Sequence, residues 1–430
     1  MSSSTLAATP TSAPPAGAVR DAAAVRRSLQ QAQARRKWTA IALTLPLLLF
    51  LLATLLVPIG ALLLRAVENP EVAASLSRTG AALSGWNKTS PPPAASYAAV
   101  AADLAALDDG AQAGALARRL NTEASGARSL VMGSYRAVRD VDTWGKDLAP
   151  EATRDKLLAL DPRWGELKYW QAIAKNASRW TPDYLLTSLD LKRQPEGGIA
   201  MVAPDQRVFA RILLRTFEIS GVVTLWCLLL AYPLAYWLST LKPRQANVLM
   251  ILVLVPFWTS ILVRVAAWIV LLQREGLVNK SLAALSIIQQ PLELLFNRTG
   301  VVIAMVHILL PFMILPLYSV MKSVPPTYLR AAVSLGSPPL AAFFRVYVPQ
   351  TFPGMGAGAL LVFILSIGYY VTPALLGGAD DQMLSYYIAQ YTNVDINWGM
   401  ACALGAVLLT TTLMLYAVYR KLAKAELSLG

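Results

Sequence analysis

The sequence predicts an all-α protein that crosses a membrane several times. Apolar residues make up 56% of the 430 positions and charged residues only 15%, compared with about 45–50% and about 25% in soluble domains. Six mainly apolar stretches are each long enough, at about 1.5 Å of helix per residue, to cross roughly 30 Å of hydrocarbon. These stretches run over residues 38–64, 212–241, 246–272, 300–321, 354–376 and 398–419.

The amino-terminal segment differs from the first apolar stretch. Residues 1–37 are rich in Ala, Ser and Pro and end in the basic residues Arg35, Arg36 and Lys37. Such a composition cannot bury a core, so we expect a disordered basic segment. The first transmembrane helix, residues 38–66, is longer than the apolar region of a signal peptide, and no small-residue cleavage site follows it. We therefore expect an uncleaved anchor.

Residues 67–208 have the composition of a soluble insert, because charged residues recur every few positions. The spacing of Leu104, Leu107, Ala111 and Ala115 is helical, whereas alternating strand patterns are scarce. The segment also holds five tryptophans, for which a hydrophobic core is the simplest role and a docking surface the alternative: Trp86, Trp144, Trp164, Trp170 and Trp180. We predict a mainly helical insert between the first and second transmembrane helices.

The distribution of charge orients the chain. If the amino terminus is cytoplasmic, the cytoplasmic segments hold 14 Lys and Arg and only two acidic residues, and the insert holds 17 basic and 17 acidic residues. Cytoplasmic flanks of membrane proteins carry such an excess of Lys and Arg. We therefore place both termini and the tail, residues 421–430, in the cytoplasm and the insert outside it. The net charge of +13 then reflects topology and gives no reason to expect nucleic-acid binding.

The sequence predicts no catalytic or metal centre. It lacks the GxxxxGK[ST] phosphate loop, the GxSxG elbow and the HExxH pair. The one histidine, His307, and the two cysteines, Cys227 and Cys402, lie in apolar stretches, where we expect them to pack as core residues. We expect neither an enzyme nor a bound cofactor or metal.

The connection over residues 323–354 contains two amphipathic patterns on the cytoplasmic side. Pro325 can start a helix, and Gly336 can end it with a left-handed residue. Pro338 and Pro339 can start a second helix, which predicts two short helices joined at a glycine. They would present a contact face to the cytoplasm; the alternative is a loop folded back on its own bundle.

The same segment resembles the EAA loop of permease subunits of bacterial ABC importers. Ala331, Ala332, Gly336 and Pro349 match the family pattern, whereas Arg330 stands where the family usually has glutamate. In that family the loop is a coupling helix that seats in a groove of the ATP-binding subunit. The resemblance therefore implies a coupling surface that comprises Leu329, Arg330, Ala331, Ala332, Leu335, Gly336, Phe343, Phe344 and Pro349. The charge reversal at Arg330 means that a family salt bridge at this position is not carried over.

Four further stretches are similar to the spermidine/putrescine branch of these permeases: residues 231–237, 255–268, 310–318 and 371–378. The resemblance covers about Phe209 to Tyr419 and, more weakly, the first transmembrane helix, but not the insert. It implies a type I importer permease with six transmembrane helices and a permease core over residues 209–420. The implied setting is the bacterial inner membrane, with a second permease subunit, a dimer of ATP-binding subunits that uses ATP and Mg, and a periplasmic substrate-binding protein.

A polyamine pathway requires carboxylates and aromatic faces, because ion pairs and cation–π contacts replace the water lost by ammonium groups. The candidate pathway residues are Glu218, Trp258, Arg264, Tyr369, Tyr370, Asp380, Asp381 and Tyr386. Charges inside apolar spans are costly, so Arg264 and Glu218 belong either to the pathway or to a structural ion pair with each other. Interface anchoring and solvated loops are the alternatives for the aromatic residues and the aspartates.

The predicted function is transport of polyamines (putrescine and spermidine) or related small amines by alternating access, coupled to a separate ATPase. An importer of the same architecture for opines, 4-aminobutyrate-like amino acids or another small solute is the alternative. A stand-alone secondary transporter or a membrane ligand sensor is the alternative from a different class. No repeat pair with interrupted half-helices supports the former, and no cytoplasmic signalling domain supports the latter.

Overall fold

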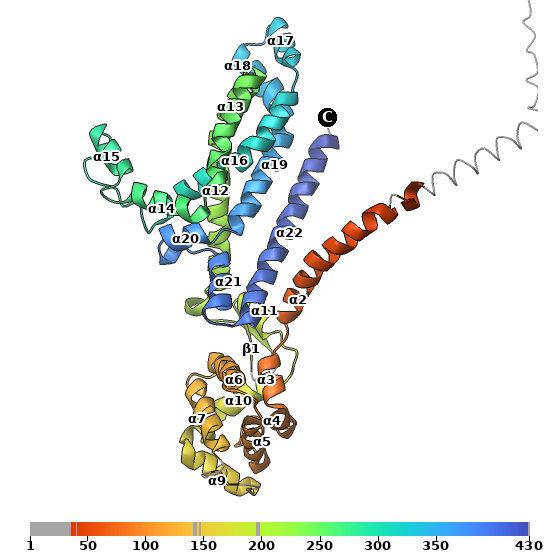
Figure 1. The fold of residues 1–430 in the computed structure, drawn as a ribbon, viewed down its shortest axis with the longest axis vertical. Helices are drawn as coiled ribbons and strands as arrows, with labels where there is room; N and C mark the ends of the chain where they lie inside the picture. Colours follow the sequence, from red (N-terminus) through yellow and green to blue (C-terminus); the bar gives the residue numbers. More distant parts are fainter. Residues whose placement is uncertain (1–35, 40, 141–143, 146–147, 195–197, 429–430) are drawn as a thin grey trace, which may run out of the picture. The chain divides into compact units, whose positions relative to one another are not determined.

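The computed structural model describes residues 36–39, 41–140, 144–145, 148–194 and 198–428. Disorder is predicted for residues 1–37; residues 1–35 lie outside the described residues, whereas Arg36 and Lys37 already belong to the first apolar helix. The described part is mainly helical (Figure 1), which confirms the predicted all-α membrane class. The chain divides into two units, Met1–Leu62 and Leu63–Gly430. The first unit holds most of the apolar helix Arg36–Arg65, whose last elements are η1 (Leu52–Leu56) and α2 (Val57–Arg65).

Five helices of the described residues are long and apolar enough to cross a membrane: Arg36–Arg65, Phe209–Thr240, Arg298–Ser323, Pro339–Ile367 and Trp398–Lys421. A sixth candidate is a broken pair, Pro243–Trp258 and Ile261–Ala284, bent by 95°. The apolar stretch over residues 246–272 is therefore divided between two helices that meet at this bend. The break occurs because Thr259 and Ser260 adopt extended backbone, with ψ of 145° and 144°, directly after the short turn that contains Pro256.

The elements of the membrane part follow one another from Phe209 onward. They are α12 (Phe209–Thr240), α13 (Pro243–Leu254), η4 (Val255–Trp258), α14 (Ile261–Leu272), α15 (Leu277–Ala284), α16 (Arg298–Ser323), α17 (Pro326–Ser334), α18 (Pro339–Ala342), η5 (Phe343–Tyr347), α19 (Val348–Ile367), α20 (Val371–Leu376), η6 (Ala379–Asp381), α21 (Leu384–Asn393) and α22 (Trp398–Ser428). The predicted stretch 354–376 thus divides: α19 ends at Ile367, and α20 is a separate short helix.

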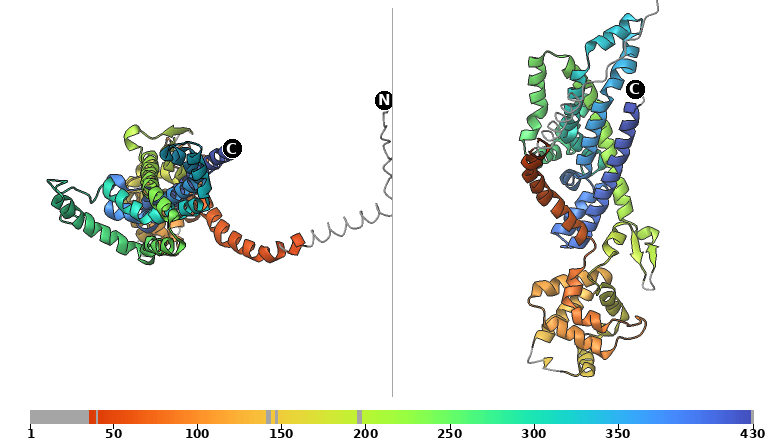
Figure 2. Two further views of the ribbon diagram at one scale, coloured as in Figure 1. Left: turned by 90° about the horizontal axis from the view of Figure 1, so that it is seen from above. Right: turned by 90° about the vertical axis from the view of Figure 1, so that its right-hand side faces the viewer.

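The helices α12, α16 and α19 form the centre of the membrane part and lie side by side in Figures 1 and 2. Two glycines spaced four residues apart let α19 approach α16 closely. A Cβ at Gly354 would lie 2.9 Å from the Cβ of Val320, and one at Gly358 would lie 2.7 Å from the Sδ of Met313. The internal prolines Pro233, Pro311 and Pro316 do not interrupt their helices.

The segment between the first two apolar helices contains short helices and one hairpin. Its elements are α3 (Pro70–Ser75), α4 (Ser77–Ala82), α5 (Ala94–Ala105), α6 (Gly110–Glu123), α7 (Ala127–Arg139), α9 (Pro150–Leu160), η2 (Pro162–Gly165), α10 (Leu167–Asn176), α11 (Asp183–Ser188), β1 (Leu191–Arg193), β2 (Ile199–Met201) and η3 (Pro204–Gln206). The strands pair antiparallel, with Leu191 opposite Met201.

Two tryptophans lie at the centre of the insert core. The Nε1 of Trp164 donates to the Oγ of Ser134 at 2.9 Å, and the Nε1 of Trp170 donates to the carbonyl of Trp164 at 2.8 Å. The ring of Tyr97 lies 4.6 Å from that of Trp170. Because each buried N–H has an acceptor, the rings contribute their apolar area without an unpaired donor. By contrast, Trp180 is half exposed.

Side-chain contacts join the insert to the ends of α12 and α22. Both carboxylate oxygens of Asp190 accept from the first N–H groups of α12, including that of Phe209 at 3.1 Å. The ring of Tyr184 packs so closely on α22 that a Cβ at Gly399 would lie 2.3 Å from it. Asp190 therefore caps a long apolar helix, and glycine is required where Tyr184 docks.

Candidate functional site

The predicted coupling loop ends its first helix in a left-handed glycine turn. Gly336 has a φ of +92°. Its N–H donates to the carbonyl of Val333 at 3.0 Å, and the N–H of Ser337 donates to the carbonyl of Ala332 at 3.1 Å. These two bonds satisfy carbonyls at the end of α17. No atom lies within 4 Å of a Cβ built at Gly336, so the backbone conformation alone selects glycine.

The second predicted short helix of the loop is not separate, which corrects the sequence-based expectation. From Pro339 the chain remains helical through α18, η5 and α19 to Ile367. The element η5 is a π-helical turn that directly precedes Val348 and Pro349. A widened turn at this point reduces the clash between the ring of Pro349 and the preceding carbonyls, so the helix continues through it.

Large apolar side chains at the tip of the loop are exposed. Leu335 is 89% exposed, Leu340 is 73% exposed and Phe344 is 60% exposed. Arg330 is also exposed and makes no ion pair within the part of the chain that the structure describes. Exposed apolar side chains gathered around a turn are typical of a surface that another protein covers.

An aromatic cluster anchors the loop on α12. The ring of Phe343 lies 5.1 Å from that of Tyr236 and stacks on Tyr347 at 5.4 Å, and Tyr236 and Tyr347 are 5.3 Å apart. Beside this cluster, the hydroxyl of Tyr232 is 3.1 Å from the Oγ1 of Thr351. Phe343 therefore faces its own bundle while its neighbour Phe344 faces outward.

The remaining predicted loop residues divide in the same way. Leu329 packs partly against the membrane core, whereas Ala331 and Pro349 are exposed and Ala332 is half-buried. The loop pattern predicts Phe343 as a contact residue like Phe344, and it gives no role to Tyr236. The tyrosine spacing in residues 231–237 was the available signal, because Tyr232 and Tyr236 lie one helical turn apart.

A second cluster of predicted residues lies at the start of α16. The Nη1 of Arg298 is 2.8 Å from the Oε1 of Glu218, and its Nε is 3.4 Å from the Oδ1 of Asp381. Arg215 donates to two backbone carbonyls of the loop that contains Asp381. Arg298, which no sequence pattern predicts as a site residue, thus brings two predicted acids together.

Of the two alternatives for Glu218 and Arg264, an ion pair with each other does not occur in the structure. Glu218 pairs with Arg298 instead. The Nε of Arg264 is buried and has no hydrogen-bond partner among the described residues. The helix α14 packs on α20, and the buried hydroxyls of Tyr369 and Thr372 lie near each other and near Arg264. These three groups form a polar site inside an otherwise apolar region.

The other pathway candidates do not join this site. Trp258 is 76% exposed at the bend between η4 and α14, and Asp380 is fully exposed, 4.0 Å from Arg215. Tyr370 is partly exposed, and Tyr386 makes an edge-to-face contact with Tyr387 at 5.4 Å. Their positions agree better with solvated loops and interface anchors than with a shared lining of one solute pathway.

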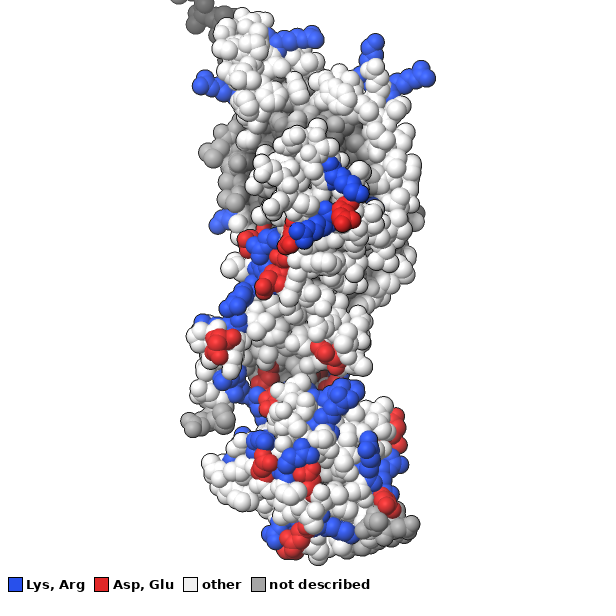
Figure 3. Space-filling view, turned by 90° about the vertical axis from the view of Figure 1, so that its left-hand side faces the viewer, with Lys and Arg blue, Asp and Glu red and all other residues white. Residues whose placement is uncertain are grey.

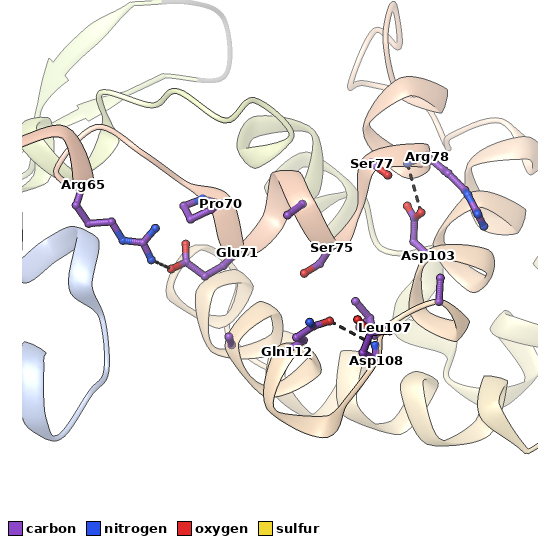
Figure 4. Close-up of a pocket in the computed structure, with 13 residues that line it drawn as sticks. Arg65, Pro70, Glu71, Ser75, Ser77, Arg78, Asp103, Leu107, Asp108 and Gln112 are labelled. Atoms are coloured by element: carbon purple, nitrogen blue, oxygen red, sulfur yellow. Dashed lines mark hydrogen bonds and ion pairs between the residues drawn. The ribbon is translucent and has the colours of Figure 1, made fainter. Parts of the chain in front are cut away.

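One cavity borders the Arg298 cluster and another lies in the insert. A groove of about 660 Å³ between α12, α14 and α16 is mainly apolar, and in it the Nε1 of Trp268 donates to the Nδ1 of His307 at 3.2 Å. A pocket of about 550 Å³ in the insert has Arg65 paired with Glu71, as Figure 4 shows. There Asp103 accepts from backbone N–H groups of α4 and so serves as a helix cap. No group of three or more potential metal ligands occurs among the described residues.

Comparison with known proteins shows the family. A family model described as "Binding-protein-dependent transport system inner membrane component" matches residues 228–426. The spermidine/putrescine transport system permease protein PotB of Haemophilus influenzae is 36% identical over 215 residues, 50% of this chain and 75% of that protein. For PotB of Escherichia coli the identity is 34% over 213 residues, 49% of this chain and 77% of that protein.

Among solved structures, a chain of a bacterial alginate ABC transporter, crystallised with an alginate pentasaccharide-bound periplasmic protein, has a TM-score of 0.43 and 16% identity. The match covers 51% of this chain and 80% of that chain. At 36% identity over three quarters of a relative, this chain belongs to the inner-membrane components of binding-protein-dependent transport systems, as a multi-pass ABC importer permease subunit and not an enzyme.

Proposed function

We propose that the chain forms part of the transmembrane pathway of an ATP-driven importer for polyamines or related small amines. ATP and Mg are used by a separate ATP-binding subunit, a second permease subunit completes the pathway, and a periplasmic binding protein delivers the solute. The names of the relatives, which refer to spermidine and putrescine transport, support the choice of solute.

The exposed apolar tip of the coupling loop is the observation that supports the coupling role best. Leu335, Leu340 and Phe344 present apolar surface, while Phe343 fixes the base of the loop on α12. A force on the tip is thereby transmitted to a long helix of the bundle, since the aromatic rings pack without a flexible linker. Closure of the ATPase subunits would then switch the bundle between outward and inward access.

We also propose that both termini and the coupling loop are cytoplasmic and the insert is periplasmic. The charge pattern supports this orientation. On the face shown in Figure 3, the end of the bundle near α17 carries Lys and Arg without acidic residues, whereas both signs are mixed over the insert. The basic end is the one expected to face the cytoplasm.

Photocrosslinking from adjacent positions tests the coupling role. A benzophenone amino acid at Phe344 should label the ATPase subunit in membranes that contain the assembled complex. The same probe at Phe343 is the matched control and should label several-fold less, because its ring faces α12. Equal labelling from both positions, or none from Phe344 while a control site in the partner permease does label, would contradict the proposal.

One observation favours a second candidate solute, an amine that also carries a carboxylate. The guanidinium of Arg264 has no described ion pair, and an uncompensated positive charge repels a polyammonium solute but attracts a carboxylate. Opines and 4-aminobutyrate-like amino acids have this chemistry.

A solute-dependent ATPase assay with the whole complex distinguishes the two candidates. If a polyamine is the solute, spermidine or putrescine should stimulate hydrolysis, and Arg264→Gln should preserve or increase the stimulation. If a zwitterion is the solute, 4-aminobutyrate should stimulate hydrolysis, and Arg264→Gln should abolish that response while Arg264→Lys retains part of it.

A further inference from the structure

A pocket where the insert meets the turn before α22 has the composition of an anion site. It has a volume of about 490 Å³ and is lined by α6, the start of α7, Tyr184 and the turn over residues 394–398. Three arginines line it, Arg118, Arg119 and Arg128. None of the transport machinery described above uses this pocket.

Arg119 forms the fixed wall of the pocket. It is only 7% exposed, and its Nη2 donates to the Oδ1 of Asn176 at 2.7 Å while its Nη1 lies 3.2 Å from the Oε1 of Glu123. Its guanidinium lies 4.8 Å from the ring centre of Tyr184. The buried Nε has no partner within the described part of the chain, so one donor of a rigidly held arginine remains unsatisfied.

The other two arginines carry positive charge that nothing in the described chain neutralises. The side chains of Arg118 and Arg128 make no ion pair or hydrogen bond among the described residues. Of the two acids that line the pocket, Glu71 is paired with Arg65. The other, Asp395, lies in the turn before α22. The pocket therefore has an excess of guanidinium groups together with one available carboxylate.

The pocket opens where a membrane span begins. The turn presents Val394, Ile396 and Trp398 as exposed apolar side chains, and Trp398 is the first residue of the apolar helix that ends at Lys421. Tryptophan and other large apolar residues at such a position lie at the level of the lipid headgroups. Burial raises the pKa of Tyr184 to about 12, so its hydroxyl keeps its proton at physiological pH.

We propose that this pocket binds the phosphodiester headgroup of a membrane phospholipid whose outer end carries hydrogen-bond donors. The guanidinium groups of Arg118 and Arg128 bind the phosphate, for which their planar donors are suited. The carboxylate of Asp395 accepts from the hydroxyl or ammonium group of the headgroup. The lipid thereby ties the insert to the outer end of α22, whichever solute the importer carries.

Lipid retention by the purified full-length chain tests the assignment. The protein in detergent is incubated with vesicles of phosphatidylglycerol, phosphatidylethanolamine or phosphatidylcholine, and bound lipid is counted by native mass spectrometry. We expect retention of the first two lipids over phosphatidylcholine, whose headgroup has no donor. The double variant Arg118→Gln, Arg128→Gln should lower retention by about tenfold, because two charge-assisted contacts are lost.

Arg136→Gln is the matched control, since Arg136 is an exposed arginine of α7 outside this pocket, and it should retain lipid like the wild type. Asp395→Asn keeps all three arginines and should lower the retention of phosphatidylglycerol and phosphatidylethanolamine toward that of phosphatidylcholine, because the carboxylate that accepts from their donors is lost. Equal retention by the wild type and the double variant would overturn the proposal. Full displacement of lipid by millimolar inorganic phosphate would also overturn it, because the pocket would then be a site for free phosphate.

Discussion

At the residue scale, the backbone conformation of Gly336 leads to a prediction about coupling. Its φ of +92° with open space around the Cβ position means that a side chain there would cost about 1–2 kcal/mol through the backbone alone. Gly336→Val should therefore unfold the turn and lower the solute transported per ATP hydrolysed in proteoliposomes that contain the complex.

Gly336→Asn is the control for that substitution, because asparagine tolerates left-handed backbone. It should keep the coupling ratio near that of the wild type. If the valine variant couples transport as well as the asparagine variant does, the turn has no role in coupling.

A second residue-scale prediction concerns Arg298, which holds Glu218 and Asp381. Arg298→Gln leaves both acids without their cation and should lower the free energy of unfolding by about 1 kcal/mol, after allowance for partial exposure to solvent. Arg274→Gln is the control, because Arg274 is exposed and has no described ion pair. It should leave the free energy of unfolding unchanged. Thermal unfolding of the two variants in the same detergent provides the measurement, and identical midpoints would refute a structural role for Arg298.

At the element scale, the close approach of α19 to α16 sets the packing of the bundle. Gly358→Val should lower the free energy of unfolding by about 2–3 kcal/mol, the upper part of the range for overpacked cores. The cost is high because a Cβ would also lie 3.2 Å from the carbonyl oxygen of Met313, which cannot rotate away. Gly221→Val on α12 is the control, since nothing lies within 4 Å of its Cβ position. Fluorescence-detected thermal melting would reveal the difference, and equal melting temperatures would contradict the packing described.

The loop also shows which features of an element the sequence can predict. The turn at Gly336 follows from local chemistry, because a glycine between proline-initiated helices has few other roles. The orientations of Phe343 and Phe344 do not follow, since the π turn η5 shifts the helical phase on which a spacing argument depends. The break before α14 had a signal in Pro256, but Pro233 and Pro316 lie in unbroken helices, so proline alone does not locate a bend.

At the scale of the whole molecule, composition and charge predict the class of protein. They do not predict contacts between residues that are distant in the sequence. The ion pair of Glu218 with Arg298 joins residues 80 positions apart, and no periodicity of a single helix reveals such a pair. The pocket around Arg119 likewise cannot be predicted from the sequence, because residues of α6 and of the turn before α22 line it together.

Topology gives the next prediction. Protease added to intact spheroplasts should cut within the insert, residues 67–208, and spare the coupling loop, residues 323–354, because the basic flanks favour a cytoplasmic loop. Inverted membrane vesicles, in which the loop is accessible, are the control. Cleavage of the loop in intact spheroplasts would reverse the proposed orientation.

The most direct test of the central claim is solute uptake by reconstituted liposomes. We expect the chain together with its partner permease, ATPase subunits and binding protein to accumulate a labelled polyamine or related amine only when ATP and Mg are supplied on the ATPase side. The chain alone should show no uptake, with or without a proton gradient. Proton-driven uptake by the chain alone would contradict the account, because it would make the protein a self-contained transporter.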